Sequence, residues 1–200
     1  MSCLASGTPL QQYMRSLRRQ PDPGGPGGGT ARAARRFPMF TVPLKVLMKM
    51  TKIEAHEVLK ARGELVEFDQ SQQSMGQAVF VSHQWVSVHH PDPKFQQMRV
   101  LQEALSHVLD DLRYIPLDST SETAVPGAKP LYVTELRSQP LFFWYDYFSC
   151  PQLHVNTHHL LNAIDSISEY VADSAFFFAL CPTVVDPNGS RLLRRPRLVW

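Results

Sequence analysis

The sequence predicts an α/β protein built on a parallel sheet. Three apolar segments at residues 78–81, 141–144 and 175–180 have the length and the β-branched and aromatic content of buried strands. Helix-like segments separate them along the chain. This β-α-β-α-β order implies parallel strands joined by right-handed crossovers.

Two amphipathic segments supply the connecting helices. The first begins at Phe95, and its apolar residues recur at spacings of three and four: Met98, Leu101, Leu105, Val108, Leu109 and Leu112. The second has the same pattern at Leu160, Leu161, Ile164, Ile167, Tyr170 and Val171. Residues 116–130 are rich in Ser, Thr, Pro and Gly, and we expect a long surface excursion there.

A smaller N-terminal extension is expected at residues 38–77. Thr51 and Glu54 have the spacing of a capping box, which predicts a helix that begins at Thr51 and stops at Gly63. The alternating residues 65–68 predict a short edge strand.

The remaining segments are predicted to be tails. Residues 1–37 contain a Gly/Pro-rich stretch at 20–30 and carry six arginines with one aspartate, so we expect a disordered basic tail. Residues 78–185 form the predicted α/β domain, and residues 186–200 form a basic C-terminal tail. Because a doubly wound sheet normally has more than three strands, we expect the domain to be incomplete at its C-terminus.

Composition restricts the class of protein and its partners. The chain has 200 residues, a formal net charge of +2, and three cysteines without a CxxC pair, which favours a reducing, cytoplasmic location. No apolar run approaches the roughly 18 residues that a transmembrane helix needs. The terminal arginines lack a nucleic-acid reading motif, so we expect no specific nucleic-acid binding.

Polar residues follow two of the predicted strands. Ser82, His83 and Trp85 follow the first strand, whereas the second is accompanied by Trp144, Asp146, Ser149 and Gln152. The carboxyl ends of parallel strands form a crevice, and such a polar set is suited to bind a ribose or an amide. The alternative is structural: Asp146 and Ser149 cap the turn that Pro151 fixes.

Two kinds of catalytic site are disfavoured by geometry. Ser82 and His83 are adjacent on a strand and point to opposite faces, so they are not expected to form a nucleophile–base pair. A histidine-rich set (His89, His90, Cys150, His154, His158 and His159) lies partly on loops. Zinc requires three or four rigidly held ligands, so we expect no metal site and assign no catalytic residue.

Three segments together resemble Toll/interleukin-1 receptor-like (TIR-like) domains. These are VFVSHQW at 79–85, FFWYDYFSCPQ at 142–152 and AIDSISEYVADSAFFFALCP at 163–182. The set also resembles a group of protist TIR-like proteins with SHQW, HPDP and DxFSxPQ motifs and, more distantly, heterokaryon-incompatibility domains. The resemblance implies a flavodoxin-like sheet and a role in signalling or self-association.

In some TIR-like proteins the resemblance also implies NAD cleavage by a glutamate on the helix after the third strand, in a Trp-x-x-x-Glu pattern. In this chain no glutamate follows Glu169, which precedes that strand. We therefore expect a domain that acts through a protein partner or as a homo-oligomer, without a cofactor. The alternatives are a hydrolase with NAD as its substrate, and a truncated fragment without independent activity.

Overall fold

The computed structural model describes residues 35–71, 75–87, 89–117, 119–124, 127, 129–152, 157–185 and 191–192. Most of the two predicted tails lies outside the described residues, and so does His154. Arg35 to Phe37 are described, and the Phe37 side chain packs into the protein core with 9% of the residue exposed.

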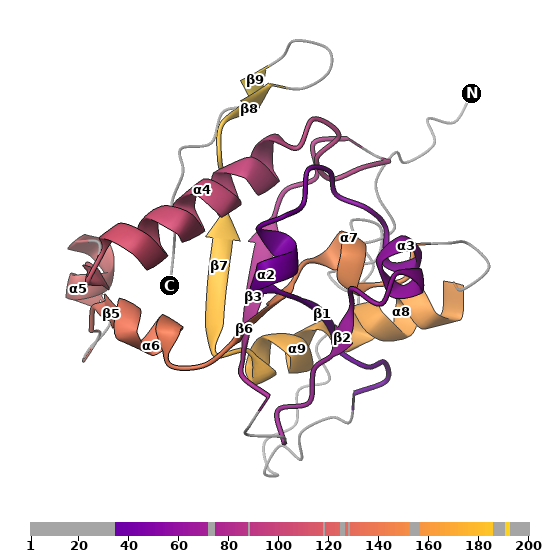
Figure 1. Cartoon of the computed structure of the whole chain (residues 1–200), viewed down its shortest axis with the longest axis horizontal. Helices are drawn as coiled ribbons and strands as arrows, with labels where there is room; N and C mark the ends of the chain where they lie inside the picture. Colours follow the sequence, from indigo (N-terminus) through magenta and orange to yellow (C-terminus); the bar gives the residue numbers. More distant parts are fainter. Residues whose placement is uncertain are drawn as a thin grey trace, which may run out of the picture.

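A mixed five-stranded sheet forms the centre of the protein (Figure 1). Its order is β2-β1-β6-β3-β7, in which β3 pairs in parallel with both β6 and β7. This confirms the α/β class and the parallel core. β1 is antiparallel to β2 and to β6, so the sheet as a whole is not parallel. The strands are β1 (Phe40–Pro43), β2 (Val66–Glu67), β3 (Gln77–His83), β6 (Leu141–Trp144) and β7 (Phe176–Leu180).

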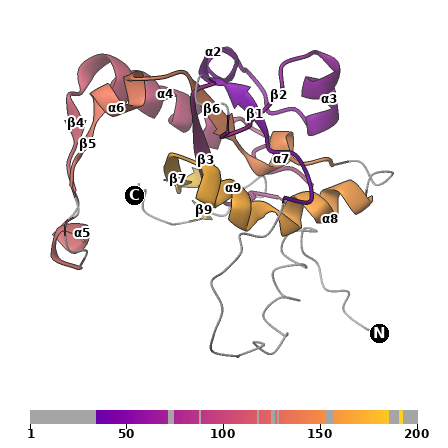
Figure 2. The same cartoon turned by 90° about the horizontal axis from the view of Figure 1, so that it is seen from below.

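Helices cover both faces of the sheet (Figure 2). One face carries α2 (Leu44–Leu47), α4 (Gln96–Asp111) and α6 (Val133–Arg137), and the other carries α8 (Thr157–Asp165) and α9 (Ile167–Asp173). The other elements are α3 (His56–Ala61), α5 (Ser119–Ala124), α7 (Asp146–Ser149), and two small ribbons, β4 (Tyr114–Ile115) with β5 (Leu131–Tyr132) and β8 (Val184–Val185) with β9 (Arg191–Leu192). None of the helices in the described part is long and apolar enough to cross a membrane.

Strand alternation divides the core into two layers. Val79 and Val81 of β3 face the α4 side, where they join Phe143, Phe178 and the buried leucines of α4. Phe80 points to the opposite side and stacks between Trp144 and Phe177, at ring-centroid distances of 4.3 and 5.4 Å. The two helix layers therefore bury separate sets of strand residues.

The N-terminal segment contributes two strands to this sheet. The predicted edge strand at 65–68 is confirmed as β2, which lies at the edge of the sheet. The predicted helix start at Thr51 is wrong, because α3 begins at His56. The Glu54 carboxylate forms ion pairs with Lys52 and Arg62, and does not act as the predicted capping-box partner of Thr51.

The second predicted helix is interrupted at Ser166. Its hydroxyl donates to the Asn162 carbonyl and accepts from the backbone amides of Arg36 and Phe37, at 2.9 and 3.3 Å. The chain therefore forms α8 and α9 as separate helices. The backbone amides of Arg36 and Phe37, far away in the sequence, are hydrogen-bonded to the residue between these two helices.

Candidate functional site

Four side chains meet at the carboxyl ends of β3 and β6, and we call them the His83 cluster: His83, Trp85, Tyr145 and Asp146. The His83 ring stacks on Tyr145 with centroids 3.7 Å apart. Its Nε2 atom lies 3.3 Å from Oδ1 of Asp146, without the alignment of a hydrogen bond. The His83 side chain is 2% exposed and that of Asp146 is 14% exposed.

The two strands explain this arrangement. His83 follows Val79 and Val81 on the same face of β3, because side chains alternate along a strand. Tyr145 continues the face that Phe143 occupies on β6, and Asp146 begins α7 immediately afterwards. Parallel pairing of β3 with β6 then brings both strand ends to the same edge of the sheet.

Asp146 is also held by an aromatic neighbour. Nε1 of Trp85 donates to Oδ2 of Asp146 at 2.8 Å. The Trp85 ring meets Tyr147 edge-on at 5.7 Å, and Tyr147 contacts the ring of His90 at 4.8 Å. The carboxylate is thus oriented by one direct donor, and the ring of that donor packs against Tyr147.

Burial controls the ionisation of the cluster. Loss of water lowers the pKa of His83, and the nearby Asp146 carboxylate offsets part of this effect. Burial also raises the pKa of the Tyr145 hydroxyl well above its ordinary value. The neutral imidazole and the neutral phenol are therefore the favoured forms near neutral pH.

The Cys150 thiol is adjacent to the site but is not activated. The residue is 3% exposed, and burial raises the pKa of the thiol well above its ordinary value. Because the thiolate is the reactive form of cysteine, this environment disfavours nucleophilic chemistry at Cys150.

The other predicted site residues do not join the His83 cluster. Oγ of Ser149 accepts from the Tyr145 amide at 3.1 Å, and Gln152 donates from its side chain to the Cys150 carbonyl at 2.9 Å. Trp144 lies in the core on the opposite face of the sheet. Ser82 alternates with His83 and also faces away from the cluster. Of the seven candidate residues, the structure brings together His83, Trp85 and Asp146.

The candidate residues chosen from the sequence include none from the loop that precedes α4. The Asp92 carboxylate accepts from the amides of Gln96 and Met98 at 2.8 and 3.0 Å, and Gln97 donates to the carbonyls of Gln84 and Pro91. His90 accepts from the Asp92 amide through Nδ1. The signal was the HPDP motif itself, whose polar residues hold the loop beside the His83 cluster.

Tyr145 was missed as well, and alternation along β6 would have found it. Metal ligation has no counterpart in the described part of the chain, where no three His, Cys, Asp or Glu side chains are grouped as ligands. His158 instead contacts the Asn162 side chain at 3.2 Å.

Comparison with known proteins adds no assignment. No family model, curated protein or solved structure matches this chain.

Proposed function

We propose that the chain is a TIR-like domain that acts through protein–protein contacts, with a second copy of itself as the partner. The observation that carries this proposal is strand β7, with the sequence Phe-Phe-Phe-Ala-Leu, at the edge of the sheet. Within the described residues, β7 pairs with β3 and with no other strand. An apolar strand at the edge of a sheet is a template for pairing with another chain.

The strand is suited to pair with itself. Antiparallel pairing of two copies about Phe178 places Phe177 of each copy opposite Ala179 of the other, so that a large side chain faces a small one. None of the five residues is charged, so no like charges meet across the two-fold axis. A C2 interface of this kind extends the sheet from one copy into the next.

Side-chain exposure agrees with this interface. Phe177 is 39% exposed although its ring stacks on Phe80. Pairing with a second copy covers the exposed part of this ring, and burial of aromatic surface favours association.

The TIR-like part of the proposal is supported by strand order. Of the three parallel strands, β3 comes first in the chain and lies between β6 and β7. A flavodoxin-like sheet also has its first strand between its second and third strands.

Light scattering against protein concentration tests self-association. We expect a monomer–dimer equilibrium in the native chain, and loss of the dimer in Ala179→Lys, because a charge on the edge strand blocks pairing. Ala172→Lys is the matched control, since it places the same charge at an exposed position of helix α9. A chain that stays monomeric up to millimolar concentration contradicts the proposal.

NAD cleavage is a second candidate function, favoured by the position of Asp146 beside His83 and Trp85 at the strand ends. Released nicotinamide, measured after incubation of the purified chain with NAD, is the assay. Turnover that Asp146→Ala abolishes supports this function. Absence of turnover at high protein concentration rejects it and leaves the association proposal untouched.

A further inference from the structure

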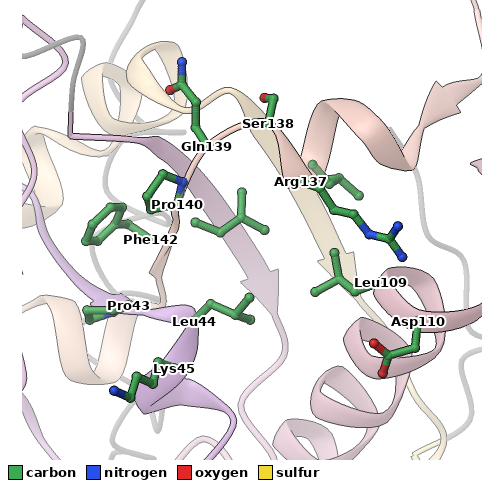
Figure 3. Close-up of a pocket in the computed structure, with 12 residues that line it drawn as sticks. Pro43, Leu44, Lys45, Leu109, Asp110, Arg137, Ser138, Gln139, Pro140 and Phe142 are labelled. Atoms are coloured by element: carbon green, nitrogen blue, oxygen red, sulfur yellow. The ribbon is translucent and has the colours of Figure 1, made fainter.

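A cavity of about 690 Å³ lies at the amino ends of the parallel strands, opposite to the His83 cluster (Figure 3). Its walls come from the β1–α2 junction, the last turn of α4, the end of α6 and the start of β6. The volume is within the range of small-molecule sites. The lining residues are Pro43, Leu44, Lys45, Leu109, Asp110, Leu136, Arg137, Ser138, Gln139, Pro140, Leu141 and Phe142.

Hydrogen bonds fix the elements around the cavity. The Pro140 carbonyl accepts from the Gln77 amide at 2.8 Å, which attaches the α6–β6 connection to β3. Gln102 of α4 donates from its side chain to the carbonyls of Leu47 and Met50, at 2.8 and 2.9 Å. The cavity is thus formed by anchored elements, and little ordering is required when a ligand binds.

The cavity is apolar inside and charged at its rim. Leu44, Leu109 and Phe142 line the cavity and are only partly buried, so they present apolar surface to it, whereas Leu136 and Leu141 belong to the core behind them. Lys45 lies on one side of the opening, and Arg137 and Asp110 lie on the other (Figure 3). The ligand that suits this arrangement has an apolar body and one charged end.

The charges at the rim indicate the sign of the ligand's charged end. Among the described residues, Lys45 and Arg137 form no ion pair with a carboxylate, whereas the Asp110 carboxylate accepts from the Ser106 hydroxyl at 2.9 Å. Because two cations and one anion lie at the rim, the cavity favours a ligand that carries a single negative charge. Asp110 disfavours a doubly charged phosphate, because like charges repel.

We propose that this cavity binds an apolar carboxylate, such as a medium-chain fatty acid. The hydrocarbon chain contacts the leucine walls, and the carboxylate binds the planar guanidinium of Arg137. Lys45 adds positive potential at the same opening. This site is independent of the β7 edge, because it lies among α2, α4 and α6.

Decanoate, kept below its micelle concentration, is the probe. We expect saturable binding to the full chain by calorimetry, with NMR shifts at the methyl groups of Leu109, Leu136 and Leu141. Arg137→Gln weakens binding about fivefold, the scale of an exposed charged contact. Arg99→Gln, at an exposed position of α4 outside the cavity lining, is the matched control and leaves the affinity unchanged.

Three results would overturn the proposal. The first is the absence of saturable decanoate binding, and the second is equal binding of decylammonium, which shares the chain but reverses the charge. The third is a set of methyl shifts centred on leucines away from the cavity, such as Leu59. Arg137 is exposed, so its substitution is expected to leave the fold intact, and far-UV circular dichroism verifies this.

Discussion

The imidazole of His83 lies flat on the phenol ring of Tyr145, with centroids 3.7 Å apart and an interplanar angle of 11°. Among the described residues, the Tyr145 hydroxyl has no hydrogen-bond partner. Both rings are buried between β3, β6 and the loop that precedes α4. Protonation of His83 would place a cation in this enclosed position, where Asp146 is its nearest counter-charge.

We predict that His83 titrates below the ordinary histidine range, because burial lowers its pKa. NMR of the imidazole C–H protons measures this directly. The Asp146→Asn substitution removes a carboxylate that raises the pKa of His83, so the pKa should fall further in that variant. A rise in Asp146→Asn would contradict the assigned cause.

Stability should decrease with acid through the same group. His83 and His56 both have lowered pKa values in the folded protein, whereas the unfolded chain has ordinary ones. The unfolded state therefore binds more protons, and stability present above about pH 6.5 is lost as the pH falls toward the folded pKa values. Urea titrations across this range should show a smaller pH dependence in His83→Gln than in the native chain.

Asp92→Ala should destabilise the protein by about 2 kcal/mol, because Asp92 is 2% exposed and its carboxylate accepts from two amides at the start of α4. Urea unfolding measures the loss. Asp111→Ala is the control: this carboxylate is 66% exposed, contacts His107, and should change stability by less than about 0.5 kcal/mol. Equal losses in both variants would argue against a capping role for Asp92.

Gly76→Ala should cost about 2–3 kcal/mol. Gly76 has a φ of +131°, and an added Cβ would lie 2.3 Å from the Pro140 carbonyl oxygen, which accepts from the Gln77 amide. Gly63→Ala tests the conformational part alone, since φ is +69° and an added Cβ has no atom within 4 Å. It should cost about 1 kcal/mol by thermal or urea unfolding.

Arg35→Gln should destabilise the protein by about 2 kcal/mol, because it removes a cation from the Asp173 side chain, which is 4% exposed. The adjacent Arg36 pairs with Asp165, where the two side chains are 67% and 26% exposed. Arg36→Gln should therefore cost less than about 0.5 kcal/mol. Comparable unfolding midpoints for the two variants would show that burial of Asp173 has no effect on this pair.

Local patterns predicted the parts of the fold that depend on neighbours in sequence. The apolar runs at 78–81 and 175–180 indicated β3 and β7, and the spacing from Met98 to Leu109 indicated α4. The break at Ser166 could not be predicted this way, because its hydroxyl binds amides at Arg36 and Phe37. Hydrogen bonds between residues so far apart in the chain leave no periodic pattern in the sequence.

The sequence predicted only part of the candidate site. Two strand ends were expected to meet, and His83 and Asp146 do so. Trp144 was included by its position in sequence, although its alternation with Phe143 and Tyr145 assigns it to the other face. The hydrogen bonds between the Ser149 and Gln152 side chains and nearby backbone groups could be identified only from atomic positions. From the sequence alone, the same residue types are equally suited to ligand binding.

The place of β6 in the sheet has a consequence for the order of folding. β6 lies between β1 and β3, yet both of those strands precede it in the chain. During synthesis, β1 and β3 emerge first and must remain apart until Leu141–Trp144 inserts between them. The pairing of Val42 with Phe143 spans a large sequence separation, which slows closure of the sheet. A nascent chain that ends before β6 therefore leaves Val79 and Phe80 without their neighbours Phe143 and Trp144. Apolar surface that is transiently exposed in this way favours aggregation.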